Sequence, residues 1–202
     1  MSLTDPYQPP LPRVLLNLTL FAVCWFICIL SGTKGLPWLG VAAAAAVIWV
    51  HLRAVPRPRR EGLVIAAAVL LGVLWDGQIS GHGWVLYTGG TPMRWLPPLW
   101  ILATWAAFAT LLNVSLRWLR GRYGLAMALG GLSAPVAYAV GAGLGAASFP
   151  DKLIALLVVA VGWGVSLPVL VALAARWDGL IESNESPLRS AQTDQSEAAG
   201  RV

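Results

Sequence analysis

Six apolar runs, each close to the length that crosses a membrane, constrain the fold of this chain more than any other feature. They cover about residues 14–31, 36–52, 62–80, 97–116, 124–147 and 153–175. A transmembrane helix needs about 20 apolar residues, and these runs lack the polar stripe of a helix in a soluble protein. Only 11% of the 202 residues are charged, against about a quarter in soluble domains. The sequence therefore predicts an all-α integral membrane protein, a bundle of about six transmembrane helices.

The basic residues predict the orientation of this bundle. Six spans with an internal amino terminus place 11 arginines on the cytoplasmic side, and leave only Lys34, Arg94 and Lys152 on the other. This asymmetry follows the positive-inside rule, so both termini are expected in the cytoplasm. Residues 1–13 are expected to be an extended, proline-containing lead-in. Residues 178–202, which are polar from Glu182 onward, are expected to be a disordered tail after a transmembrane domain at 14–177.

Two short basic loops also suggest partners. Membrane insertion accounts for their arginines, and contact with anionic lipid headgroups is the alternative interpretation. The net charge of +5 thus gives no reason to expect a nucleic-acid partner. The arginines concerned are Arg53, Arg57, Arg59, Arg60, Arg117, Arg120 and Arg122.

Most motifs of soluble enzymes are missing from the sequence. Cys24 and Cys28 share one helix face, but two thiols are too few for a zinc site, and inert buried thiols are the simpler interpretation. His51 and His82 are expected at opposite membrane surfaces. No phosphate-binding, dinucleotide-binding or metalloprotease motif occurs. We therefore expect neither a metal nor a cofactor.

Asp76 is the only acidic residue set within an apolar run. If the third run begins at Gly62, Asp76 lies about 21 Å along it, or about 9 Å below the outer edge of the hydrocarbon. Helix rise places Thr104 and Tyr138 at nearly the same depth. Because an ionisable group within a span is costly, these three side chains form a candidate polar pocket. Lys34, Arg94 and Lys152 are its possible charge partners at the mouth.

The alternative is that the helix ends early at Asp76-Gly77 and leaves the carboxylate at the water interface. Asn113 and Ser115 are expected near the cytoplasmic edge, far from Asp76, where they form interhelical hydrogen bonds or touch headgroups. The apolar connection 81–96, with Trp84, Tyr87 and Trp95, fits an interfacial aromatic belt, or else a lid over the pocket.

Several segments together resemble one known family. They are Gly35-Leu36-Pro37-Trp38, Pro56-Arg57-Pro58-Arg59-Arg60-Glu61, Asp76, Pro98-Leu99-Trp100 leading through Phe108 to Leu112-Asn113-x-Ser115-Leu116-Arg117-Trp118-Leu119, and Pro135-x-x-Tyr138-x-x-Gly141-x-x-Leu144-Gly145-Ala146. The family is the bacterial inner-membrane domain of unknown function 2878, and the resemblance covers about residues 14–177. It implies a small multi-spanning inner-membrane protein, favours a link to membrane lipid metabolism, and supplies no catalytic residues.

Two functions remain open from the sequence. In the first, the protein is a non-catalytic membrane component that binds a lipid or a partner protein, and Asp76 has a structural role. In the second, it is an integral-membrane enzyme that modifies a lipid, or a lipid carrier, and uses an outer-leaflet pocket around Asp76. Ion transport is a weaker third, because the spans hold no chain of acidic residues for a relay.

Overall fold

The computed structural model describes residues 7–89 and 91–181, and this part of the chain holds six α-helices. They are α1 (Leu11–Thr33), α2 (Pro37–Arg53), α3 (Pro58–Gly81), α4 (Leu99–Ala109), α5 (Tyr123–Gly143) and α6 (Lys152–Arg176). A short 3-10 helix η1 (Arg117–Leu119) follows α4, and strands β1 (Leu86–Tyr87) and β2 (Ala147–Ser148) pair antiparallel.

Four of these helices, α1, α3, α5 and α6, are long and apolar enough to cross a membrane. The prediction of a helical membrane protein is therefore confirmed. Helix α2, with 17 residues, and α4, with 11 residues, are shorter apolar helices. At 1.5 Å per residue α4 is only about 16 Å long, which is about half the thickness of the hydrocarbon core.

The fourth and fifth runs end earlier than the sequence predicted. After Ala109 the chain passes through turns to residue 116 instead of continuing as helix. Thr110 and Asn113 interrupt this segment, because the Thr110 hydroxyl bonds the Ala107 carbonyl and the Asn113 side chain bonds another helix. Helix α5 ends at Gly143 rather than at 147, since Gly145 takes a positive φ of 85° that turns the chain into β2.

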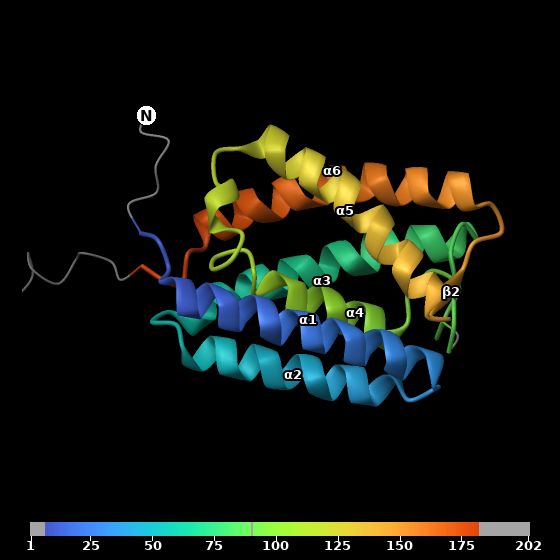
Figure 1. Cartoon of the computed structure of the whole chain (residues 1–202), viewed down its shortest axis with the longest axis horizontal. Coiled ribbons are helices and arrows are strands. Elements are labelled where there is room, and N and C mark those ends of the chain that lie inside the picture. The colour runs from blue at the N-terminus through green and yellow to red at the C-terminus, as the bar shows by residue number, and fades with distance from the viewer. Residues whose placement is uncertain (1–6, 90, 182–202) are drawn as a thin grey trace, which may run out of the picture.

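The helices pack as two pairs around a centre (Figure 1). Helix α1 lies beside α2, α5 lies beside α6, and α3 and α4 lie between the two pairs. Glycines allow close approach at these contacts. A Cβ on Gly72 or Gly162 would overlap the ring of Trp105 or Trp75, respectively, at less than 3 Å. Small residues at helix contacts are a main source of packing between membrane helices.

Replacing Gly130 on α5 with alanine is expected to weaken the α5–α6 contact. A Cβ at this position would lie 2.3 Å from the Trp163 carbonyl oxygen of α6, so the two backbones must move apart. We expect a loss of about 1–3 kcal/mol in unfolding free energy, measured by thermal unfolding in detergent. Gly131→Ala is the matched control, because its Cβ meets Ala160 only at 3.4 Å. Equal stability of the two variants would contradict this packing.

The two ends of the described chain meet at one end of the bundle. The Tyr7 carbonyl accepts a hydrogen bond from Arg117, and Arg117 also pairs with Asp178, which follows α6. At the opposite end Thr88 after β1 bonds the Gly145 carbonyl beside β2. Asp178 and Leu180 are buried, so the predicted disordered tail does not begin at 178. The rest of that predicted tail, from 182, lies outside the described residues, as do 1–6 of the lead-in.

Candidate functional site

The Asp76 carboxylate lies inside the protein, near one end of α3. It is fully buried, and α3 continues to Gly81, about 7.5 Å beyond it. Asp76 thus neither ends the helix nor faces water. Its Oδ1 accepts hydrogen bonds from the hydroxyls of Tyr87 and Tyr138, and its Oδ2 accepts one from Trp105 Nε1 at 2.6 Å. We call these four residues the Asp76 cluster.

Of the residues predicted to join Asp76, the structure brings only Tyr138 into hydrogen-bonding contact. The Thr104 hydroxyl donates instead to the Trp100 carbonyl of its own helix at 2.8 Å. Among the described residues, no hydrogen bond or ion pair joins Asp76 to Lys34, Arg94 or Lys152. These three are exposed, and Arg94 donates to the Gly81 carbonyl at 3.2 Å. Two tyrosine hydroxyls and an indole N–H bind the Asp76 carboxylate, where a cationic side chain had been predicted.

Tyr87 and Trp105 are partners of Asp76 that the sequence did not predict. Tyr87 was expected in an interfacial belt, but it is only 8% exposed and reaches inward from β1. Pairing of β1 with β2 fixes its position at the end of the bundle. Burial of the Tyr87 phenol, next to the Asp76 carboxylate, raises its pKa well above the usual value. The connection 81–96 therefore supplies Tyr87 to the interior of the bundle. Trp95 of the same connection is 47% exposed.

An apolar cavity of about 450 Å³ adjoins the Asp76 cluster. Helices α1, α4 and α5 supply most of its walls, α6 adds Trp163 and Leu167, and β2 adds Ala147. Tyr87, Trp105 and Tyr138 all line it, so the donors to Asp76 form part of the wall while the carboxylate lies behind them. Thr104 lines the same cavity. This cavity is large enough for a small ligand, and it adjoins a buried acid.

The cavity opens at the side of the bundle. Its lining includes Phe26 of α1, which is 49% exposed, and Ala22 and Ser133, which are also exposed. These residues lie on α1 and α5, and both helices expose large apolar side chains along their length. Both helices are among the four that are long and apolar enough to cross a membrane.

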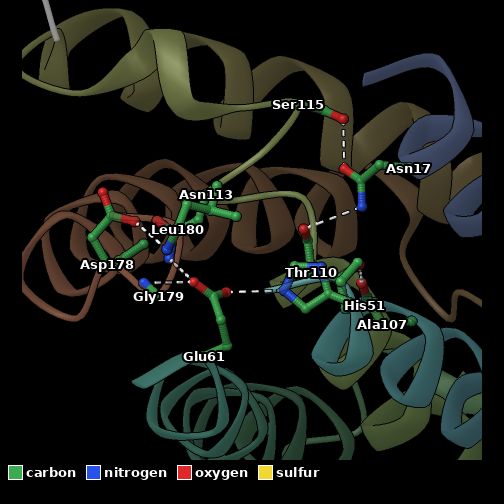
Figure 2. Close-up of polar contacts among 12 residues, drawn as sticks. Asn17, His51, Glu61, Ala107, Thr110, Asn113, Ser115, Asp178, Gly179 and Leu180 are labelled. Carbon is green, nitrogen blue, oxygen red and sulfur yellow. Dashed lines mark hydrogen bonds and ion pairs between the residues drawn. The ribbon is translucent and has the colours of Figure 1, made fainter. Parts of the chain in front are cut away.

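A second buried carboxylate, Glu61, occupies the other end of α3 (Figure 2). Glu61 is 1% exposed, and it contacts His51 Nε2 at 3.0 Å, Asn113 Nδ2 at 2.7 Å and the Gly179 backbone N–H at 2.9 Å. A Cβ on Gly179 would lie 2.7 Å from a Glu61 oxygen, so only glycine fits there. Glu61 thus joins the end of α2, the turns after α4 and the segment after α6.

Arginines extend this contact into a buried ionic network. Arg120 donates to Asn113 at 2.5 Å and pairs with Asp178 at 2.8 Å, and Arg117 pairs with the same Asp178 oxygen at 2.8 Å. Burial raises the pKa of Asp178, but the hydrogen bonds from Arg117 and Arg120 outweigh it and hold the pKa below the usual value. Asp178 is therefore ionised at neutral pH and neutralises both arginines in part. We call this set, with His51 and Glu61, the Glu61 network.

The Glu61 network changes the interpretation of several predicted contacts. Asn113 lies far from Asp76, because Glu61 and Asp76 are about 22 Å apart along α3. Ser115 lies in the turns after α4 and donates to Asn17 of α1 at 2.5 Å. Arg117, for which headgroup contact was the alternative interpretation, is 1% exposed. Arg53, Arg59, Arg60 and Arg122 remain exposed.

His51 and Glu61 flank a short loop, so they are close in sequence across a hairpin. That signal was available in the sequence, but Glu61 lies just before the third apolar run at 62–80 and was not among the predicted site residues. Cys24 and Cys28 are buried and not bonded to each other.

These features define a multi-helix membrane protein with a lateral apolar cavity and two buried carboxylate clusters. A model of the family "Protein of unknown function (DUF2878)" matches residues 14–169, which is most of the chain. The chain belongs to this family, and the resemblance noted from the sequence is confirmed. No curated protein and no solved structure matches the chain.

Proposed function

We propose that this protein binds one lipid-soluble molecule in the cavity between α1, α4 and α5, as a non-catalytic component of membrane lipid metabolism. The observation that carries the proposal is the apolar cavity of about 450 Å³ with its lateral mouth. At about 30 Å³ for a water-sized group, this volume holds a molecule of about 15 such groups. That is the size of one lipid chain or ring system, not of a whole phospholipid.

The Asp76 cluster supports a structural rather than a catalytic role for the acid. Both carboxylate oxygens are occupied by hydrogen bonds, and Asp76 does not itself line the cavity. The cluster ties α3, α4, α5 and β1 together, so it holds the cavity walls in place. A pocket whose walls are preformed binds its ligand without a large cost of ordering.

The alternative is a lipid-modifying enzyme or lipid carrier that uses the same cavity. One observation favours it, since the hydroxyls of Tyr87 and Tyr138 connect the cavity wall to a buried acid. A change in the lipid composition of cells when Asp76 is replaced by asparagine would favour this alternative. An unchanged composition, with the ligand still bound, fits the non-catalytic proposal.

The orientation in the membrane is part of the same proposal. We place the chain in the bacterial inner membrane, with all six helices within the bilayer and both termini cytoplasmic. The bundle end that holds the start of α1 and the end of α6 carries Arg13, Arg53, Arg117, Arg120 and Arg176, whereas Lys34 and Lys152 lie at the other end. The positive-inside rule then makes the arginine-rich end cytoplasmic. The exposed arginines there are candidates for anionic headgroups.

Filling the cavity tests the binding proposal. Ala137 lines it, so Ala137→Phe is expected to abolish retention of a bound molecule. The control is Ala128→Phe on the same helix, at an exposed position outside the lining. Native mass spectrometry of the purified protein in detergent should show one retained molecule for the wild type and for Ala128→Phe, but none for Ala137→Phe. Equal occupancy of the two variants, or none in any of the three proteins, would overturn the proposal.

A further inference from the structure

The inner wall of the cavity offers a ligand carbon and almost no polar atom. The three donors of the Asp76 cluster line the cavity, but all of them are bonded to the Asp76 carboxylate. The Thr104 hydroxyl lines it as well and donates to the Trp100 carbonyl of its own helix. The polar groups of these side chains are therefore engaged within the protein.

The remaining polar side chains of the lining do not change this. The indole nitrogens of Trp100 and Trp163 have almost no accessible surface, so they are closed off from the cavity. Ser133 is exposed at the mouth, and Trp25 is half-buried on α1. A polar group deep in the cavity would lose its partners outside and find none in the inner wall, which costs free energy. The enclosed part of a ligand is therefore hydrocarbon.

The cavity is long and narrow. Its lining on α5 runs from Leu129 to Gly141, which is about 18 Å at 1.5 Å per residue. The volume of about 450 Å³ spread over that length leaves a mean cross-section of about 25 Å², or about 5 Å across. Carbon atoms in contact lie about 3.5–4.0 Å apart, so a passage of this width holds one chain and not two side by side.

Length and volume agree on the size of that chain. Three single bonds of an extended chain span about 3.6 Å, so a length of about 18 Å takes about 15 carbon atoms. The volume corresponds to about 15 groups as well. A fused ring system of the same volume would be shorter and wider than this cavity.

We propose that the cavity encloses one hydrocarbon chain of about 15 carbon atoms, which lies along the bundle between α1, α4 and α5, while the polar end of the same molecule stays outside. This inference rests on the proposed function, since it names the part of the lipid-soluble molecule that enters the same cavity. Contacts among the rings of the wall keep the passage in shape. Trp163 stacks on Trp105 with ring centroids 4.3 Å apart, and Phe108 meets Trp163 edge-on at 5.1 Å.

A competition between two fatty acids tests the apolar interior. Stearic acid and 12-hydroxystearic acid have the same chain, but the second carries a hydroxyl that an enclosed run of about 15 carbon atoms must include. An equimolar mixture is added in excess to the full chain in digitonin, a detergent without a linear chain, and native mass spectrometry reads the two bound masses. We expect stearic acid to be favoured about 5- to 100-fold, the range for burying a hydroxyl without a partner.

Enlarging one end of the cavity tests where the chain lies. Leu129 marks one end of the lining on α5, and Leu129→Ala adds room for about two or three carbon atoms. Molecules that this variant retains from the membrane should carry chains about two carbon atoms longer than those of the wild type, read by mass spectrometry. Leu132→Ala is the matched control, because Leu132 is 73% exposed on the same helix and does not line the cavity. It should retain chains of wild-type length.

The outcomes separate this inference from the proposed function. Equal binding of the two fatty acids, or the same retained chain length in Leu129→Ala and Leu132→Ala, overturns the chain proposal and leaves the cavity a binding site. A retained molecule that has no chain, such as a fused ring, also overturns it. Ala137→Phe, which fills the cavity, gives the background of binding to detergent. If the wild type binds neither fatty acid above this background and retains no molecule, both proposals fail.

Discussion

Asp76→Ala should cost about 2–5 kcal/mol of unfolding free energy, because it leaves three buried donors without their acceptor. Tyr87, Trp105 and Tyr138 all point at the carboxylate, and water cannot replace it in a fully buried site. Each donor belongs to a different element, so α4, α5 and β1 lose a shared anchor on α3. Chemical or thermal unfolding in detergent, followed by circular dichroism, measures the loss.

Two further variants serve as an intermediate case and a control for this prediction. Asp76→Asn keeps one carbonyl oxygen for the tyrosines but turns an amide toward the Trp105 N–H, so an intermediate loss is expected. Gln78→Ala changes an exposed neighbour on the same helix and should be close to neutral. If Asp76→Ala were as stable as Gln78→Ala, the carboxylate would have no structural role, and the cavity wall would not depend on it.

Glu61→Ala has the second large expected effect. We expect a loss of about 3–5 kcal/mol of unfolding free energy, because the variant removes the buried carboxylate that three partners contact. His51, Asn113 and the Gly179 N–H all lose their acceptor. The segment after α6 should also loosen, since Gly179 is one of its attachments to α3. Limited proteolysis is therefore expected to cut between Trp177 and Ile181 faster in the variant, alongside a lower unfolding midpoint.

Glu61→Gln and Arg60→Ala serve as the comparison for this prediction. Glu61→Gln keeps an oxygen for Asn113 and Gly179 and should retain most of the protection of the segment after α6. Arg60 is exposed beside Glu61, so its removal should change little. Faster proteolysis in Arg60→Ala than in Glu61→Ala would contradict the role of Glu61 as an attachment point.

The depth of the candidate residues could be predicted from the sequence, but the direction of their side chains could not. Helix rise placed Thr104 and Tyr138 level with Asp76, and Tyr138 does bind it. On α4, however, the partner is Trp105, one residue further on. Adjacent residues point about 100° apart on a helix, so the rotation of α4 decides which of them faces Asp76. Packing against Gly72 of α3 sets that rotation, and no local pattern reveals it.

Contacts between distant segments were also beyond the sequence. Tyr87 reaches Asp76 because β1 pairs with β2, which lies about 60 residues later in the chain. Asp178 has a fixed position because it pairs with Arg117 of η1 and with Arg120, which follows η1. The residues from 182 on are polar, and the tail predicted from that composition also took in Asp178.

The sequence by itself determined that this chain is a helical membrane protein and where most of its helices lie, although α4 ends seven residues before the end of its apolar run. Those properties follow from hydrophobic runs and from the fixed rise of an α-helix. Only the tertiary structure decided that Asp76 is bound on both oxygens, that Glu61 has a buried network, and that a lateral cavity separates α1 from α5. These depend on how each helix is rotated and packed, which is set by side-chain fit between helices far apart in sequence.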